Sequence, residues 1–466
     1  MGYFLISAAH KSSGKTTISI GLTAALRQRG LRVQTFKKGP DYIDPMWLAA
    51  ASGRPCYNLD FHQMKQEEIT SLFFSHLHAA DIGLIEANKG LYDGLDLEGS
   101  NSNAALAILL GAPVVLVIDA RGMTRGIAPL ILGYQSFEPR INVAGVILNR
   151  LGGQRHEAKL RAVIEHYTQV PVLGAVPNTP EFEIHERHLG LVTLQEREHA
   201  QGLIDILGKR IADYVDLNGL ESIAASPRLP GSIDMITGKA PSAALALHLT
   251  KKRRIGVMRD AAFNFYYADD IEYLDKHAEI IFIDALHDKR LPNIDGLIIG
   301  GGFPETQMRR LEANHDLRHA IKTAINDGDL PTYAECGGLM YLSQAIHWKN
   351  NSAEMVGIIR ATTIMHDHPQ GRGYVRLRPT PKLPWPTSGE DDIMGHEFHY
   401  SSLANLPENT TFAFAVTRGY GIDGKYDGIV HKNLLASYTH LRGYGVLPWP
   451  ERFLRFVEWV STQRSR

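Results

Sequence analysis

The stretch GYFLISAAHKSSGKTT, residues 2–17, decides the fold of the first half of this sequence. Its apolar start predicts a β-strand, and its end opens the helically periodic segment ISIGLTAAL. A strand, a short polar loop and a helix N-terminus in this order are what a nucleoside triphosphate site requires. We therefore predict a phosphate-binding loop with the nucleotide contacts Ser13, Gly14, Lys15, Thr16 and Thr17.

Three residues of this loop have distinct predicted tasks. Gly14 lets the backbone approach the phosphates, Lys15 reaches the β- and γ-phosphoryl oxygens, and Thr16 offers its hydroxyl to Mg²⁺. The pattern departs from the usual one because Ala9 stands where its first glycine is expected. The alternative is an ordinary turn between a strand and a helix.

The composition is that of a globular protein with more than one domain. The chain has 466 residues, of which 44% are hydrophobic and 21% charged, too many for one ordinary core. A formal net charge of -1 gives no reason to expect nucleic acid or an anionic membrane as a partner. The two cysteines exclude a disulfide scaffold, and neither a signal-peptide pattern nor a long apolar span is present. We therefore predict a cytoplasmic protein.

Lysines and carboxylates gather where two further strands are predicted to end. Residues 31–36 read as a strand followed by a turn, and residues 82–85 as a buried strand. Ligands of open parallel α/β sheets bind at the carboxyl ends of the strands. The predicted metal ligands are Thr16, Asp41 and Glu86, and the predicted substrate contacts are Lys38, Asp44 and Asp93. Helix capping is the alternative for Asp44, and a solvated loop charge is the alternative for the other acidic residues.

Strand-like and helical segments alternate through residues 1–235. Strands are predicted within residues 112–120, 142–150 and 170–178, with helical patterns between them. This alternation predicts an α/β fold, a parallel sheet with helices on both faces. Asn149, near one strand end, is predicted to contact the adenine of a nucleotide, with a turn-stabilising role as the alternative.

A linker is predicted at residues 236–252, because the region around it is rich in proline and glycine, loses periodicity and ends in a basic run. A second α/β pattern follows in residues 253–466. It contains a strand that runs into three glycines, where the backbone N–H groups of Gly301 and Gly302 are predicted to stabilise an oxyanion. A plain tight turn is the alternative.

The stretch LPTYAECGGLMYL, residues 330–342, predicts a nucleophile. A short strand delivers Cys336 to the start of a helix, and the two following glycines permit a sharp turn and close approach of a substrate. A cysteine that is merely buried beside a turn is the alternative, and that description fits Cys56 better. His440 is the favoured base, with His396 and His399 as competitors, and this choice depends in part on the following resemblance.

The chain resembles the cobyrinic acid a,c-diamide synthases, glutamine-dependent amidotransferases that act on corrinoid precursors. The resemblance covers nearly the whole chain and rests on ordered motifs: HKSSGKTT, FKKGPDYIDP, EANKGLYDG, ERHLGL, AFNFYY, GGGFPE, AECGGLMYL, GHEFHYS and SYTHL. It implies a dethiobiotin synthetase-like domain that binds ATP and a tetrapyrrole, then a class I glutamine amidotransferase-like domain. The family's nucleophile and base fall on Cys336 and His440, and its acidic ATP-domain residues on Asp41, Asp44, Glu86 and Asp93.

One departure concerns the base. Glutaminase triads carry an acidic residue two positions after the histidine, but this position holds Arg442, so the group that orients His440 is open.

The resemblance implies ATP- and glutamine-dependent amidation of the a and c acetates of a tetrapyrrole polycarboxylate, with Mg²⁺ as cofactor. Alternatives are the same reaction on sirohaem or another sirohydrochlorin-derived ring, a P-loop ATPase switch with an inactive glutaminase-like domain, and a tetrapyrrole carrier. The sequence leaves a monomer or a homodimer open.

Overall fold

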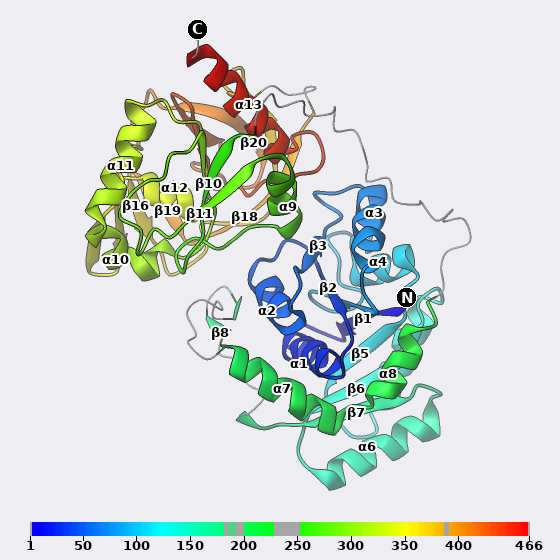
Figure 1. The fold of residues 1–466 in the computed structure, drawn as a ribbon. Coiled ribbons are helices and arrows are strands. Elements are labelled where there is room, and N and C mark those ends of the chain that lie inside the picture. The colour runs from blue at the N-terminus through cyan, green and yellow to red at the C-terminus, as the bar shows by residue number, and fades with distance from the viewer. Residues whose placement is uncertain are drawn as a thin grey trace. The chain divides into compact units, whose positions relative to one another are not determined.

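The computed structural model describes residues 2–180, 186–187, 190–191, 200–227, 252–385 and 391–464. The chain forms two compact units, Met1–Ser242 and Ala243–Arg466 (Figure 1). Of the predicted linker, all but Lys252 lies outside the described residues, as do residues 188–189 of the ERHLGL motif. Among the helices that the structure describes, none has the length and apolarity needed to cross a membrane.

The first unit contains a seven-stranded sheet in which every pairing is parallel, in the order β3-β2-β4-β1-β5-β6-β7. Its strands are β1 (Gly2–Ala8), β2 (Val33–Lys38), β3 (Tyr57–Leu59), β4 (Ile82–Glu86), β5 (Val114–Asp119), β6 (Val143–Leu151) and β7 (Val172–Pro177). The helices are α1 (Lys15–Gln28), α2 (Ile43–Ser52), α3 (Gln66–Leu77), α4 (Asn103–Leu110), α5 (Ile127–Phe137), α6 (Gln154–Tyr167), α7 (Ala200–Tyr214) and α8 (Leu217–Ala224). A two-stranded pair, β8 (Glu186–Arg187) and β9 (Gly190–Leu191), completes the unit.

Helices cover both faces of this sheet because side chains alternate along each strand. From β1, Phe4 packs in one core with Ile18 of α1 and Leu220 of α8. Its neighbour Tyr3 points to the other face and packs edge-on against Phe73 of α3, with ring centroids 5.0 Å apart. The predicted α/β fold with a parallel sheet is confirmed.

The second unit contains a nine-stranded mixed sheet in the order β11-β10-β12-β13-β22-β21-β20-β17-β18. Its strands are β10 (Arg254–Met258), β11 (Glu279–Ile283), β12 (Gly296–Ile299), β13 (Thr332–Glu335), β17 (Gly371–Pro379), β18 (Ile393–His399), β20 (Thr411–Arg418), β21 (Tyr426–His431) and β22 (Leu434–Ser437). A smaller sheet contains β14 (Ala345–Trp348), β15 (Asn351–Glu354), β16 (Thr362–Met365) and β19 (Ser401–Ala404). The helices are α9 (Ala268–His277), α10 (Met308–Ala313), α11 (His315–Asn326), α12 (Gly337–Leu342) and α13 (Trp449–Arg464). This unit confirms the second predicted α/β domain.

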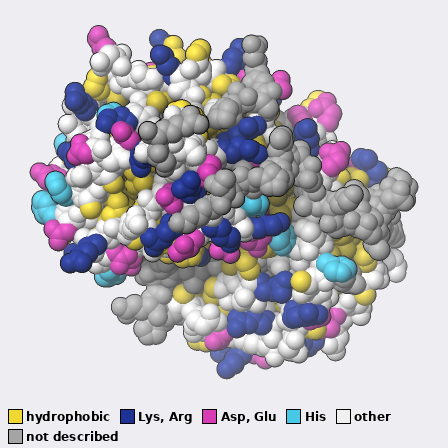
Figure 2. All heavy atoms as spheres, turned by 45° about the horizontal axis from the view of Figure 1, so that its top comes forward, with side chains coloured by type: hydrophobic (Ala, Val, Ile, Leu, Met, Phe, Trp, Pro, Cys, Tyr) yellow, Lys and Arg dark blue, Asp and Glu magenta, His cyan; other side chains and the backbone are white. Residues whose placement is uncertain are grey.

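The pairing of β13 with β22 matters most for the site. The two strands run parallel, with Glu335 opposite Ser437, so the residues that follow each strand emerge at the same edge. On the molecular face shown in Figure 2, acidic and basic side chains are interspersed, as the near-zero net charge leads one to expect.

Candidate active site

The predicted phosphate-binding loop joins β1 to α1. Gly14 caps α1 with φ 87°, in the left-handed region that favours glycine. A Cβ at this position would also lie 2.2 Å from Nδ2 of Asn149, so two independent constraints require glycine. Nδ2 of Asn149 donates to the Ser13 carbonyl at 2.9 Å, and Tyr134 donates from its hydroxyl to the Ala9 carbonyl at 2.6 Å. The structure thus places Asn149 against the loop backbone, with its amide nitrogen in use there.

Four charged or polar side chains from separate elements meet beside this loop. The Lys37 ammonium lies 2.5 Å from Asp44 Oδ2 and 3.0 Å from Glu86 Oε1. Thr16 donates from its hydroxyl to Glu86 Oε1 at 2.6 Å and lies 3.3 Å from Asp44 Oδ2. We call Thr16, Lys37, Asp44 and Glu86 the carboxylate cluster. Three of these four were predicted site residues, and Lys37 was not.

The sequence predicts a turn at Lys37 and Lys38, but β2 continues through both. Both lysines are buried. Burial of the Lys37 charge is tolerated because its ammonium contacts the carboxylates of Asp44 and Glu86. Burial and the charge of Lys37 lower the pKa of Lys15 to about 8, although Glu86 and other carboxylates oppose this. Burial likewise lowers the pKa of Lys38 to about 8, with Asp60 opposing it.

The two remaining predicted carboxylates, Asp41 and Asp93, act on Lys37 and on Lys15 respectively. Asp41 accepts from the backbone N–H groups of Ile43 and Asp44 through Oδ1, and its Oδ2 lies 3.8 Å from the Lys37 ammonium. Desolvation and Asp44 raise the pKa of Asp41 to about 7, against the effect of Lys37. Asp93 is exposed and accepts from the Gly90 N–H at 2.9 Å. The carboxylate that lies beside the Thr16 hydroxyl, with Glu86, is that of Asp44, whereas Asp41 was the predicted metal ligand.

The oxygen atoms of the carboxylate cluster fit Mg²⁺. Hydroxyl and carboxylate oxygens are the donors that this ion prefers, and Glu86 Oε2 is buried with no hydrogen-bond partner. Burial and Asp44 raise the pKa of Glu86, while Lys37 lowers it. The described residues contain no group of three or more His, Cys, Asp or Glu side chains suited to hold a metal.

In the second unit, Cys336 lies at a sharp turn between β13 and α12. Its backbone has φ 45° and ψ -99°, a conformation that non-glycine residues rarely adopt and that is often found at functional sites. The Cys336 N–H donates to the Ser437 carbonyl at 2.7 Å, which ties the turn to β22. Close packing explains Gly338, since a Cβ there would lie 2.2 Å from the Ile299 carbonyl oxygen.

His440 is hydrogen-bonded to the Cys336 thiol and buried beside it. Its Nδ1 lies 3.1 Å from Glu335 Oε2. Burial alone lowers the pKa of His440, but the contacts with Cys336 and Glu335 outweigh burial and raise it to about 10. The structure thus brings the predicted nucleophile and base together and adds a carboxylate.

The two competing histidines have other surroundings. The His396 ring stacks on the His440 ring with centroids 4.9 Å apart, and the two residues exchange backbone hydrogen bonds. His399 stacks on Tyr438, with centroids 3.9 Å apart, and its Nδ1 lies 2.8 Å from the Ser401 carbonyl oxygen.

The two predicted oxyanion residues have different environments. A Cβ on Gly337 would lie 3.0 Å from the Gly302 nitrogen, so Gly302 lies beside the residue that follows the nucleophile. The carbonyl of Gly301 accepts from the N–H groups of Asn264 and Phe265, both at 3.1 Å. A Cβ on Gly301 would lie 2.6 Å from Cε1 of His440, so the absence of a side chain makes room for the imidazole.

Glu335 is a site residue that the sequence motifs did not predict. Its position directly before Cys336, at the end of a predicted strand, was the available signal. Arg442 stands where the triad acid was expected, and its guanidinium lies 3.1 Å from Asp269 Oδ2 on α9. It also lies over the rings of Tyr267 and Tyr444.

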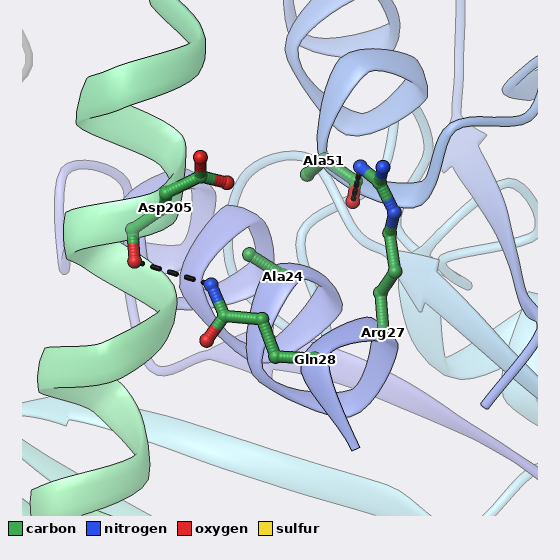
Figure 3. Close-up of a pocket in the computed structure, with 5 residues that line it drawn as sticks. All are labelled: Ala24, Arg27, Gln28, Ala51 and Asp205. Carbon is green, nitrogen blue, oxygen red and sulfur yellow. Dashed lines mark hydrogen bonds between the residues drawn. The ribbon is translucent and has the colours of Figure 1, made fainter. Parts of the chain in front are cut away.

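A pocket elsewhere in the first unit has no part in these sites. It lies between α1, α2 and α7 and is lined by Ala24, Arg27, Gln28, Ala51 and Asp205 (Figure 3). Gln28 donates to the Asp205 carbonyl and Arg27 to the Ala51 carbonyl. This is the end of α1 opposite Lys15, about 18 Å away at 1.5 Å per residue.

Comparisons with known proteins agree with both halves of this description. The CobQ/CobB/MinD/ParA nucleotide binding domain family matches residues 5–192, and the CobB/CobQ-like glutamine amidotransferase domain family matches residues 254–443. The chain is 44% identical over 455 residues to the cobyrinate a,c-diamide synthase of Magnetococcus marinus, covering 97% of this chain and 96% of that protein. It is 40% identical over 444 residues to the enzyme of the same name from Archaeoglobus fulgidus, covering 94% and 93%. The chain therefore belongs to the cobyrinate a,c-diamide synthase family, and it is a ligase with glutamine as amido donor and an ATP-using nucleotide-binding domain.

Proposed function

We propose that this enzyme amidates the a and c acetate carboxylates of a cobyrinic-acid-type tetrapyrrole, activating each with ATP as an acyl phosphate. The observation that carries the proposal is the contact between Cys336 and His440 in a chain that also holds Lys15 and the carboxylate cluster. The substrate follows from the name that its relatives bear.

Ammonia is made in the second unit. The Cys336 thiol gives its proton to His440, and the thiolate attacks the γ-amide carbon of glutamine. We place the tetrahedral oxyanion against the predicted N–H groups of Gly301 and Gly302, and against that of Gly337 beside Gly302. His440 returns the proton to the departing nitrogen, ammonia leaves, and water hydrolyses the glutamyl thioester to glutamate.

Ammonia is consumed in the first unit. The terminal phosphoryl group of ATP passes to an acetate oxygen, ADP leaves, and Lys15 stabilises the charge on the transferred group. Mg²⁺, when bound through Thr16, Asp44 and Glu86, would neutralise phosphate charge. We place the tetrapyrrole at Lys38, the neighbour of Lys37 on β2, and at Asp93, which acts electrostatically on Lys15. Ammonia then attacks the acyl carbon and phosphate leaves, giving the amide.

The test replaces the nucleophile. Cys336→Ala should abolish glutamine-supported amidation but leave ammonia-supported amidation, because the first unit keeps its residues. Mass spectrometry should show a loss of about one mass unit for each carboxylate converted, as replacement of OH by NH₂ in acyl transfer requires. Loss of both activities would refute this division of labour. ATP hydrolysis with no glutamate release by the wild type would favour the ATPase switch, and turnover of sirohaem alone would favour that ring.

A further inference from the structure

We propose that Glu335 is the acidic residue that positions His440 for glutamine hydrolysis, although it precedes the nucleophile instead of following the histidine. This inference rests on the proposed function of Cys336 and His440. It adds the group that holds the imidazole in place.

The Glu335 carboxylate is fixed in the orientation that this role requires. Oε2 lies 3.1 Å from His440 Nδ1, while Oε1 accepts from the Leu441 N–H at 2.9 Å and from the Tyr333 hydroxyl. The side chain is buried, so water competes little for these contacts. Because Nδ1 faces Glu335, the other ring nitrogen, Nε2, is left for the thiol.

The expected position of the acid is occupied by a group that cannot perform its task. Arg442 is buried, and a guanidinium has only donors, so it cannot accept the Nδ1 proton. The nearby carboxylates have other partners. Asp269 pairs with Arg442, and Asp270 accepts from the Gly443 N–H and the Trp449 indole.

Asp427 accepts from the backbone and hydroxyl of Thr439. The Glu335 carboxylate lies against His440, and the titratable side chains of Cys336 and the stacked His396 are also at the imidazole.

An ionised Glu335 has two effects on the reaction. It accepts a hydrogen bond from the Nδ1 proton of His440, which directs Nε2 toward the thiol, so that Nε2 takes and holds the proton from Cys336. It then stabilises the imidazolium formed by that transfer, while remaining ionised itself. The Glu335 carboxylate, at the end of β13 and directly before the nucleophile, thus has the positioning role that usually belongs to an acidic residue after the histidine.

The experiment compares Glu335→Gln, Glu335→Asp and Glu279→Gln in the full-length enzyme. Glu279 is the matched control, because its side chain is 58% exposed on β11 of the same sheet. Glutamate release is followed from about pH 6 to pH 10 to obtain kcat and KM for glutamine. Ammonia-supported amidation is measured in parallel.

We expect E335Q to lose up to about 10⁴-fold in kcat, the loss seen when the acid of a triad becomes an amide, with little change in KM. The alkaline limb of the pH profile should move to lower pH, because the imidazolium loses its carboxylate partner. E335D should retain more activity than E335Q, E279Q should match the wild type, and ammonia-supported amidation should persist in all three.

An E335Q kcat within about threefold of the wild type, or a fall in kcat with no shift of the alkaline limb, would overturn the inference. If E335Q does not fold, the inference is tested with E335D, which must show a reduced kcat and an alkaline limb moved to lower pH. A wild-type enzyme that releases no glutamate would overturn the proposed function instead.

Discussion

Replacing Lys37 with methionine should destabilise the first unit in a pH-dependent way. Its buried ammonium is the cation between Asp44 and Glu86, with Asp41 3.8 Å away. Removing one partner of a buried ion pair costs about 3–5 kcal/mol, because the remaining charges are buried without compensation.

The sign of the pH dependence follows from the carboxylates. Lys37 lowers the pKa of Glu86 and of Asp41, which burial raises, so both pKa values rise further without it. A carboxylate whose pKa is higher in the folded state destabilises the fold as pH rises above its unfolded pKa. The cost of K37M should therefore be small near about pH 5, where these groups take up protons, and large near about pH 8.

Hydrogen exchange of backbone amides in the full chain measures the local stability of the first unit around β2 and β4. Peptides containing β2 and β4 should exchange roughly 10²- to 10⁴-fold faster than in the wild type at the higher pH, and much less so at the lower. Peptides from the second unit serve as an internal control, and Lys159→Met, at an exposed position of α6, is the matched variant. Equal exchange in K37M and wild type, or an equal cost at both pH values, would refute the reasoning.

Two further outcomes are expected. Gly14→Ala should weaken nucleotide binding at least about tenfold in titration calorimetry, because left-handed strain of about 1–2 kcal/mol is joined by the 2.2 Å approach to Asn149. Gly30→Ala is the control, because Gly30 has a similar φ of 88° but open space where a Cβ would lie. This variant should bind nucleotide as tightly as the wild type. Equal losses of affinity in both variants would exclude the steric explanation. His440, with its pKa raised to about 10 from an ordinary 6.5, should stabilise the fold fully below pH 6.5 and lose that contribution as pH rises toward 10. Thermal unfolding should show this decline in the wild type and a smaller one in His440→Gln; identical profiles would contradict the pairing with Glu335.

The sequence by itself determined the features that depend on residues close together in the chain. A strand, a polar loop and Gly14-Lys15-Thr16 predicted the phosphate-binding loop, and the glycines after Cys336 predicted the sharp turn that the structure contains. Alternating strand and helix patterns predicted both α/β units. These signals are local because backbone conformation and helix starts depend mainly on neighbouring residues.

Only the tertiary structure decided which side chains meet. Glu335 and His440 are 105 residues apart, and the parallel register of β13 with β22 brings them together. Likewise, Lys37 lies among carboxylates from two other elements, a contact that no spacing within residues 31–41 predicts. The physical reason is that strand register and close packing fix such pairs, and both depend on residues distant in the sequence.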